Sequence, residues 1–127
     1  MSPIRMQRVE SAVRVVIAFN TAFNQQDLTA MMQLVSDDCV FESNNPAPDG
    51  GLYTGTQTIR EYWQGFFARY PRGRIKVEEL IGYGLRCIMR WRYEWEDQAG
   101  DARHVRGVDI IRVQNDLIRE ALSYIKA

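Results

Sequence analysis

The spacing of apolar residues predicts helices in the first half of this chain and strands in the second half. From Arg8 to about Gln25, apolar residues recur three and four positions apart, which is typical of one face of a helix. Asp27 is placed to cap a short second helix that runs from Leu28 to Val35. Thr56 is placed to cap a third helix, which ends at Pro71-Arg72-Gly73.

The third predicted helix carries a broad face of large side chains. These are Ile59, Tyr62, Trp63, Phe66, Phe67 and Tyr70. So many large groups in three turns indicate that the helix packs deeply against a sheet. We expect most of them to belong to the core, with Trp63 and Phe67 lining a ligand pocket.

A short strand and an irregular loop separate the second and third helices. Ser36-Asp37-Asp38 indicates a break, and the segment from Cys39 to Ser43 indicates a strand. Asn44 to Gly51 contains two prolines and two glycines, which excludes a helix or a central strand. Loops of this kind often frame a binding site when a rigid scaffold holds them.

From Ile75 onward apolar and polar residues alternate, which predicts strands. The four predicted strands run from Ile75 to Gly82, Arg86 to Glu96, Arg103 to Val113 and Leu117 to Ile125. Helices followed by an antiparallel meander belong to the α+β class. No linker interrupts the chain, so we expect a single domain over residues 1–127 in which the helices cover one face of a curved, mainly antiparallel sheet and enclose an apolar pocket.

Composition limits the possible partners. The 16 basic and 16 acidic residues balance, which argues against binding to nucleic acid or anionic lipid by bulk charge. Cys39 and Cys87 are far apart in sequence, so they suggest two reduced, buried side chains and neither a metal site nor a redox pair. No apolar run is long enough for a secretory signal or a membrane span, and we expect a cytoplasmic location.

Asp109 is the anomaly of the strand predicted from Arg103 to Val113, because Val108, Ile110 and Ile111 surround it. A buried carboxylate must find a partner or take up a proton. One interpretation is a structural ion pair with Arg90 or Arg92. The other is a pocket carboxyl of raised pKa that donates or accepts a proton.

Two further residues are candidates for proton transfer. His104 is the only histidine; it is either an exposed edge residue or, if it faces the pocket, a group that exchanges protons near neutral pH. Glu42 lies just before the proline-glycine loop, where it is either a solvated strand residue or a base at the pocket rim. Tyr124 carries a hydroxyl that can reach a ligand.

Three segments carry a family resemblance. They are Ser36-Asp37-Asp38-Cys39-Val40-Phe41-Glu42, Tyr53-Thr54-Gly55-Thr56-Gln57-Thr58-Ile59-Arg60-Glu61-Tyr62-Trp63 and Gly107-Val108-Asp109-Ile110-Ile111-Arg112-Val113. With them the chain resembles the SnoaL-like, ketosteroid-isomerase-like branch of the nuclear transport factor two-like superfamily. The resemblance implies a cone-shaped, cystatin-like fold with an internal pocket, and in many members a homodimer through the sheet face.

The activity that the resemblance implies is less specific than the fold, because the superfamily includes isomerases, cyclases, hydrolases and binding modules. By position, Asp109 matches the protonated aspartate of ketosteroid isomerase, Ser43 matches its base and Phe19 matches its tyrosine. Phe19 cannot donate a hydrogen bond and Ser43 is a poor base, which argues against steroid isomerisation. An epoxide-hydrolase constellation of Asp109, Arg106 and Glu120 matches less well, whereas a cyclase that uses Asp109 with His104 is compatible with the sequence.

We therefore expect a pocket that binds a small hydrophobic or polycyclic molecule and catalyses proton transfer without a cofactor or metal. Asp109, Glu42 and His104 are the candidate catalytic residues. The candidate ligand-binding residues are Phe19, Ser43, Trp63, Phe67, Trp91 and Tyr124. A non-catalytic binding module and a protein-interaction domain remain the alternatives. The alternating charges of the strand from Arg86 to Glu96 suit either solvent or contact with a second copy.

Overall fold

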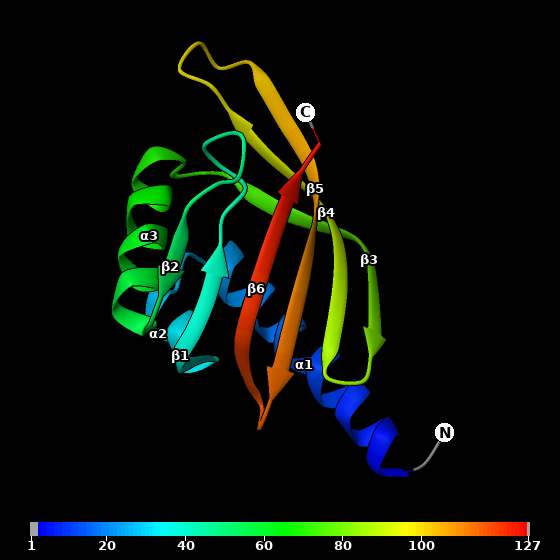
Figure 1. Cartoon of the computed structure of the whole chain (residues 1–127). Helices are drawn as coiled ribbons and strands as arrows, with labels where there is room; N and C mark the ends of the chain where they lie inside the picture. Colours follow the sequence, from blue (N-terminus) through cyan, green and yellow to red (C-terminus); the bar gives the residue numbers. More distant parts are fainter. Residues whose placement is uncertain (1–2, 127) are drawn as a thin grey trace.

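The computed structural model describes residues 3–126, with side chains from Glu10 onward, and contains three helices and six strands (Figure 1). The helices are α1 (Pro3–Asn24), α2 (Leu28–Gln33) and α3 (Thr56–Arg69). The strands are β1 (Val35–Glu42), β2 (Leu52–Thr54), β3 (Arg74–Tyr83), β4 (Arg86–Glu96), β5 (Ala102–Gln114) and β6 (Leu117–Ile125). The expected α+β arrangement of three helices against a curved sheet is confirmed.

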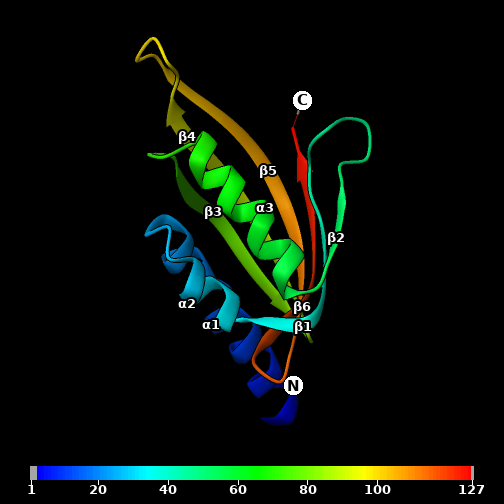
Figure 2. The same ribbon diagram turned by 90° about the vertical axis from the view of Figure 1, so that its left-hand side faces the viewer.

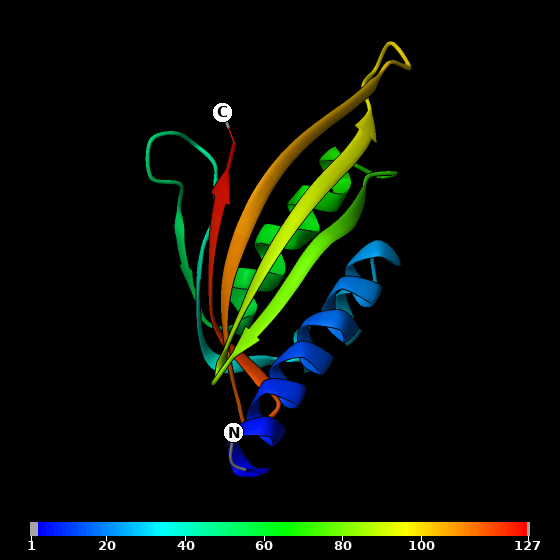
Figure 3. The ribbon, with the colours of Figure 1, turned by 90° about the vertical axis from the view of Figure 1, so that its right-hand side faces the viewer.

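The strands form one sheet in the order β2-β1-β6-β5-β4-β3. The β3–β6 meander is antiparallel as predicted, and β1 joins it by pairing in parallel with β6. The sheet curves around α3, which lies on its concave side (Figure 2). Among residues 3–126, no helix covers the outer face of β3, β4 and β5 (Figure 3). Along β4, buried side chains such as Met89 and Trp91 alternate with outward charged ones, so the sequence pattern distinguishes the two faces.

Helix α1 packs beside the edge strand β3. The amide of Asn24 donates a 3.0 Å hydrogen bond to the Ile75 carbonyl and accepts a 2.8 Å hydrogen bond from the Ile75 N–H. These two bonds satisfy backbone groups that an edge strand would otherwise leave unpaired. Within residues 3–126, no helix is both long enough and apolar enough to cross a membrane.

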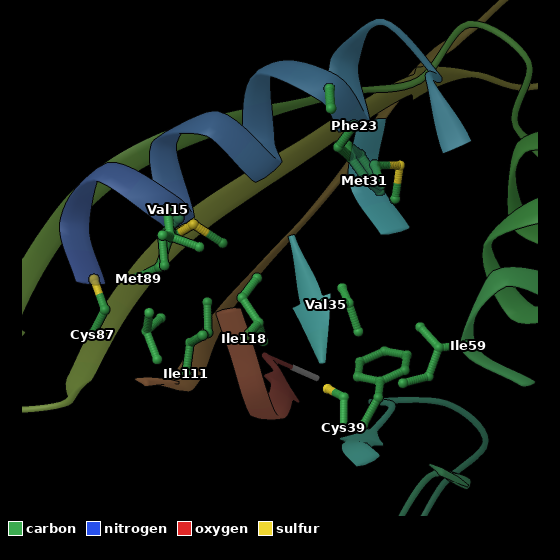
Figure 4. Close-up of a cluster of buried hydrophobic side chains, with 14 of the residues drawn as sticks. Val15, Phe23, Met31, Val35, Cys39, Ile59, Cys87, Met89, Ile111 and Ile118 are labelled. Atoms are coloured by element: carbon green, nitrogen blue, oxygen red, sulfur yellow. The ribbon is translucent and has the colours of Figure 1, made fainter. Parts of the chain in front are cut away.

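Buried side chains from all three helices and from the sheet form one core (Figure 4). Met31 is fully buried, as is Cys87, and Cys39 is almost so. Burial raises the pKa of each cysteine thiol to about 11, so both behave as small apolar groups. The expectation of two reduced, buried cysteines is confirmed.

Short sequence motifs correctly predicted the start of α2 and the break between the last two strands. Asp27 caps α2 as predicted, accepting a 3.1 Å hydrogen bond from the Ala30 N–H. Asn115 and Asp116 both have positive φ, at 55° and 60°, as the tight turn between β5 and β6 requires.

Three local predictions were wrong. The segment from Ser36 to Asp38 is not a break: β1 begins at Val35, and a register shift against β6 between Val35 and Val40 accommodates this polar stretch. Gly55, with φ of 90°, takes the cap position of α3 that was expected for Thr56. Strand β2 was not predicted, because three residues are too few to show a period.

A substitution at Gly107 tests whether the Trp91 indole packs directly on the backbone of β5. It pairs directly with Trp91, and a Cβ atom at this position would collide with Trp91 Cζ2 and with the Tyr124 carbonyl. We expect Gly107→Ala to lower the free energy of unfolding by about 1–3 kcal/mol, because the indole and a neighbouring strand must move. Urea denaturation measures this change.

Gly65 supplies the matched control. It lies exposed on α3, and an added Cβ atom would meet nothing within 4 Å. Gly65→Ala should raise the free energy of unfolding by about 0.5–1 kcal/mol, since alanine favours the helix. Equal effects of the two substitutions would contradict the proposed packing of Trp91 on Gly107.

Candidate functional site

The concave side of the sheet and the helices enclose a cavity of about 200 Å³. Residues that line it come from α1, α3, the β1–β2 connection and five of the strands. Ten of them are aromatic: Phe19, Phe23, Phe41, Tyr62, Trp63, Phe66, Tyr70, Trp91, Tyr93 and Trp95. An apolar cavity of roughly 150 Å³ holds benzene, so this one holds a molecule on the order of ten non-hydrogen atoms.

The aromatic wall is built by contacts between α3 and the sheet. The Trp63 ring lies 5.3 Å from the Phe41 ring, and the Phe66 ring lies 5.3 Å from the Tyr93 ring, measured between centroids. Burial raises the pKa of Tyr62 to about 12 and raises the pKa of Tyr93 further. Both hydroxyls therefore stay protonated at neutral pH.

Asp109 is the only acidic or basic side chain among the described residues that line the cavity. The Trp91 Nε1–H donates a 2.9 Å hydrogen bond to Asp109 Oδ1. The Ser123 hydroxyl, directly across the strand pair, also donates to the carboxyl. Asn44 supports this arrangement, because its Nδ2 donates to Ser123 Oγ over 2.9 Å.

The surroundings of Asp109 oppose ionisation. Burial raises the pKa of its carboxyl to about 6, although the hydrogen bonds from Ser123 and Trp91 act in the opposite direction. The side chain keeps some accessible surface because it lines the cavity. A carboxyl that changes its charge near pH 6 can donate or accept a proton under mild conditions.

The interpretation of Asp109 as half of a structural ion pair is wrong. Arg90 and Arg92 lie on the outer face of β4, on the opposite side of the sheet from Asp109. Arg90 Nε lies 3.7 Å from Glu79 Oε1, and Arg92 Nε lies 2.7 Å from Glu94 Oε2.

Three of the expected ligand-binding residues line the cavity together with Asp109. They are Phe19 on α1, Trp63 on α3 and Trp91 on β4. The two other candidate catalytic residues lie elsewhere. Glu42 points to the face of β1 opposite to Phe41, and His104 is exposed near the start of β5, so neither lines the cavity.

The remaining expected residues also lie outside the cavity lining. Ser43 is buried and holds the β1–β2 loop, donating to the Asn45 carbonyl over 2.8 Å and accepting from the Gly51 N–H over 2.9 Å. Phe67 is buried in the core, with its ring 5.2 Å from that of Phe23. Tyr124 is half exposed and pairs with Val108, a position on the outer face.

The polar partners of Asp109 were not predicted from the sequence. Ser123 becomes visible only when β6 is paired with β5 in the correct register, and a register shift between Arg112 and Val113 hides that pairing. Asn44 lies in a loop whose path the sequence does not determine.

Asn20, also on the cavity wall, donates a 2.9 Å hydrogen bond to Met89 Sδ. The described residues contain no cluster of three or more possible metal ligands.

The hydrogen bond from Trp91 gives a direct readout of the Asp109 charge. We expect the indole N–H resonance of Trp91 to titrate with a midpoint near pH 6 in an NMR pH series. Ser123→Ala should move the midpoint up by about one pH unit, because it removes a hydrogen bond that favours the ionised carboxylate. Asp109→Asn is the control and should abolish the titration; a midpoint near 4 in the wild type would contradict this description.

Solved structures provide the comparison for this fold. A nuclear transport factor two-like protein of unknown function from Mesorhizobium loti is 36% identical, with a TM-score of 0.80 and 94% of each chain covered. A Mycobacterium tuberculosis protein in complex with estradiol-17β-hemisuccinate is 21% identical, with a TM-score of 0.76 over 90% of this chain and 92% of that chain.

A third similar structure is that of a Catenulispora acidiphila protein with a ketosteroid isomerase-like fold, in complex with trimethylamine. It is 15% identical, with a TM-score of 0.76 over 87% of this chain and 83% of that chain. The second and third of these structures share the fold alone with this chain. No curated protein matches the chain.

The family model of the SnoaL-like domain matches residues 16–121, which include α2, α3 and β1 to β5 in full. This match and the M. loti structure confirm the resemblance seen in the three sequence segments. The chain therefore belongs to the SnoaL-like family and has the nuclear transport factor two-like fold.

Proposed function

We propose that this protein binds a small, mainly apolar molecule in the cavity and that Asp109 exchanges a proton with it. The observation that carries the proposal is the position of one carboxyl, hydrogen-bonded by Trp91 and Ser123, in a cavity whose other walls are mostly apolar and include ten aromatic residues. Apolar pockets with a few convergent polar groups are the usual form of small-molecule sites.

The proposed chemistry requires only the carboxyl. With a pKa of about 6, Asp109 exists in both protonation states around that pH, so the same group can take a proton from the ligand and return it at another atom. Isomerisation and ring closure are reactions of this kind. In addition of water, the carboxylate would take the proton from the water and deliver it to the ligand. The Trp91 and Ser123 donors stabilise the carboxylate while it holds the negative charge.

Steroid isomerisation by the family mechanism receives no support from this site. Phe19 lines the cavity without a hydrogen-bond donor, and the Ser43 hydroxyl is committed to the backbone of its own loop. Glu42 and His104, which would otherwise supply a second acid or base, lie outside the cavity lining.

A non-catalytic binding module is the second candidate function. It is favoured by the same observation that limits catalysis, namely that Asp109 is the sole acid or base on the described cavity wall. Under this alternative, Asp109 orients the ligand by a hydrogen bond and no covalent change follows. The two candidates share the cavity and differ only in whether a bound ligand is converted.

Filling the cavity tests binding itself. Ala121 lies on the cavity wall in β6, and the next residue, Leu122, belongs to the opposite face. Ala121→Trp should abolish binding of benzyl alcohol, which has about eight non-hydrogen atoms and fits the cavity. Chemical-shift perturbation of the Trp91 indole measures binding.

Ile17→Trp is the control for the filled cavity. It adds the same side chain at an exposed position of α1 that does not line the cavity, and it should leave benzyl alcohol affinity within about twofold. Circular dichroism melts verify that both variants fold, because overpacking costs about 1–3 kcal/mol. Retained binding in Ala121→Trp would exclude this cavity as the site.

We further propose that the protein is a homodimer through the outer face of the sheet. Four aliphatic residues lie side by side in one row across β3, β4, β5 and β6. They are Ile81, Ile88, Ile110 and Leu122. Ile81 is 47% exposed and Ile88 is 41% exposed, which is unusual for adjacent aliphatic side chains on a sheet.

Charged residues of both signs flank this aliphatic row. Arg86, Arg112 and Glu120 follow it on one side, and Glu79 and Arg90 lie on the other. Alternating signs around an apolar centre are self-complementary under a two-fold rotation. A second copy of the chain is therefore the partner that this face fits.

A charge placed in the row should separate the subunits. We expect Ile88→Asp to convert the dimer to a monomer in sedimentation-velocity experiments, because the buried interface would then contain an unpaired carboxylate. Ile17→Asp is the control, since Ile17 is 52% exposed on α1 and lies away from the row. A monomeric wild-type protein would contradict the proposed dimer.

A further inference from the structure

The charge of Asp109 has no counter-ion on the protein. Ion pairs among the described residues involve the surface side chains of other acids, and none includes Asp109. The cavity wall contains no described lysine, arginine or histidine that could supply one. Above about pH 6 the carboxyl is mainly ionised, so an apolar cavity then contains an uncompensated negative charge. Such a charge is unfavourable unless something neutralises it.

The hydrogen bonds at Asp109 determine which ligand group can complete the site. The indole of Trp91 and the hydroxyl of Ser123 both donate to the carboxyl. The ionised carboxyl has acceptor capacity left and no proton to give. A donor on the ligand is therefore favoured over an acceptor such as a carbonyl oxygen.

The aromatic wall favours the same kind of ligand. Tyr62, Trp63, Phe66 and Trp95 line the cavity together with other rings. The face of an aromatic ring is electron-rich and attracts a cation within about 6 Å of its centre. Because the described wall carries no positive side chain, nothing on it repels a cation.

We infer that the natural ligand carries a protonated amine, which meets the Asp109 carboxylate, on an apolar body that packs against the aromatic wall. The inference rests on the proposed function, since it requires that the cavity binds a ligand, and it adds the chemical class of that ligand. The cavity volume of about 200 Å³ limits the enclosed part to on the order of ten non-hydrogen atoms. A primary, secondary or tertiary ammonium group retains a proton to donate to Asp109.

Two probes of equal size separate the charge from the apolar contacts. Benzylammonium and benzyl alcohol have the same shape, and at neutral pH only the first is a cation. We expect benzylammonium to bind at least about tenfold more tightly, since hydrogen bonds between charged partners exceed neutral ones by this amount or more. Chemical-shift titration of the Trp91 indole, with the full-length protein, measures both affinities.

Asp109→Asn tests whether the carboxylate causes the preference. The amide has nearly the shape of the carboxyl and can still accept from Trp91, so the fold should persist. We expect this variant to bind the two probes with affinities within about twofold of each other. Asp49→Asn, an exposed position in the β1–β2 loop, removes the same charge away from the cavity and should keep the tenfold preference.

Each outcome has a distinct meaning. Equal affinities in the wild type, or tighter binding of the alcohol, would overturn the inference while leaving cavity binding intact. A cation preference that survives in Asp109→Asn would also overturn it, because the charge would then act elsewhere. If neither probe binds, the proposed function fails together with the inference.

Discussion

The register of β5 between β4 and β6 is the constraint on which the chemistry of this protein depends. It places Asp109 between Met89 and Ser123 on the inner face, and it places Gly107 opposite Trp91. A shift of one residue would turn Asp109 to the outer surface, among the ion-paired charges, and would turn Val108 and Ile110 inward. The cavity would remain apolar, but it would lose the one carboxyl that the described residues place on its wall. Strand pairing thus controls reactivity as directly as it controls stability.

Gly107 illustrates how backbone and side-chain requirements combine at one place. The indole of Trp91 lies over this residue, where a larger residue would collide with it. From that position its N–H reaches the carboxyl two residues further along β5. The donors around Asp109 are therefore fixed by the packing of the sheet and need little rearrangement when the carboxyl ionises. Fixed donors of this kind stabilise charge more effectively than mobile water in an apolar site.

Much of this arrangement could be predicted from the sequence, because periodicity reports which face of an element is buried. The alternation in β4 predicted that one face of this strand is apolar and the other charged. The apolar surroundings of Asp109 predicted either an ion pair with an arginine or a pocket carboxyl, and the pairing of Asp109 with Met89 selects the second. Its partners could not be predicted. Pairing Asp109 with Ser123 requires knowledge of the irregularity after Arg112, since uniform counting from the turn places Leu122 opposite. Tyr124 was misplaced for a related reason: adjacent residues of a strand lie on opposite faces, and the sequence alone did not decide which face was inner.

The parallel pairing of β1 with β6 affects how the site can change during evolution. Phe41 lies beside Ala121, so the first and last strands of the chain meet in one wall, and cavity residues extend from Phe19 to Ile125. No fragment shorter than residues 19–125 contains all the described lining residues, so the site forms only once the two ends of the domain have come together. Such distant pairing raises the contact order of the fold and makes the domain an indivisible unit of recombination. Lining side chains, by contrast, can be exchanged one at a time without disturbing the strand ladder, so new ligand preferences can arise within the same fold by point substitution.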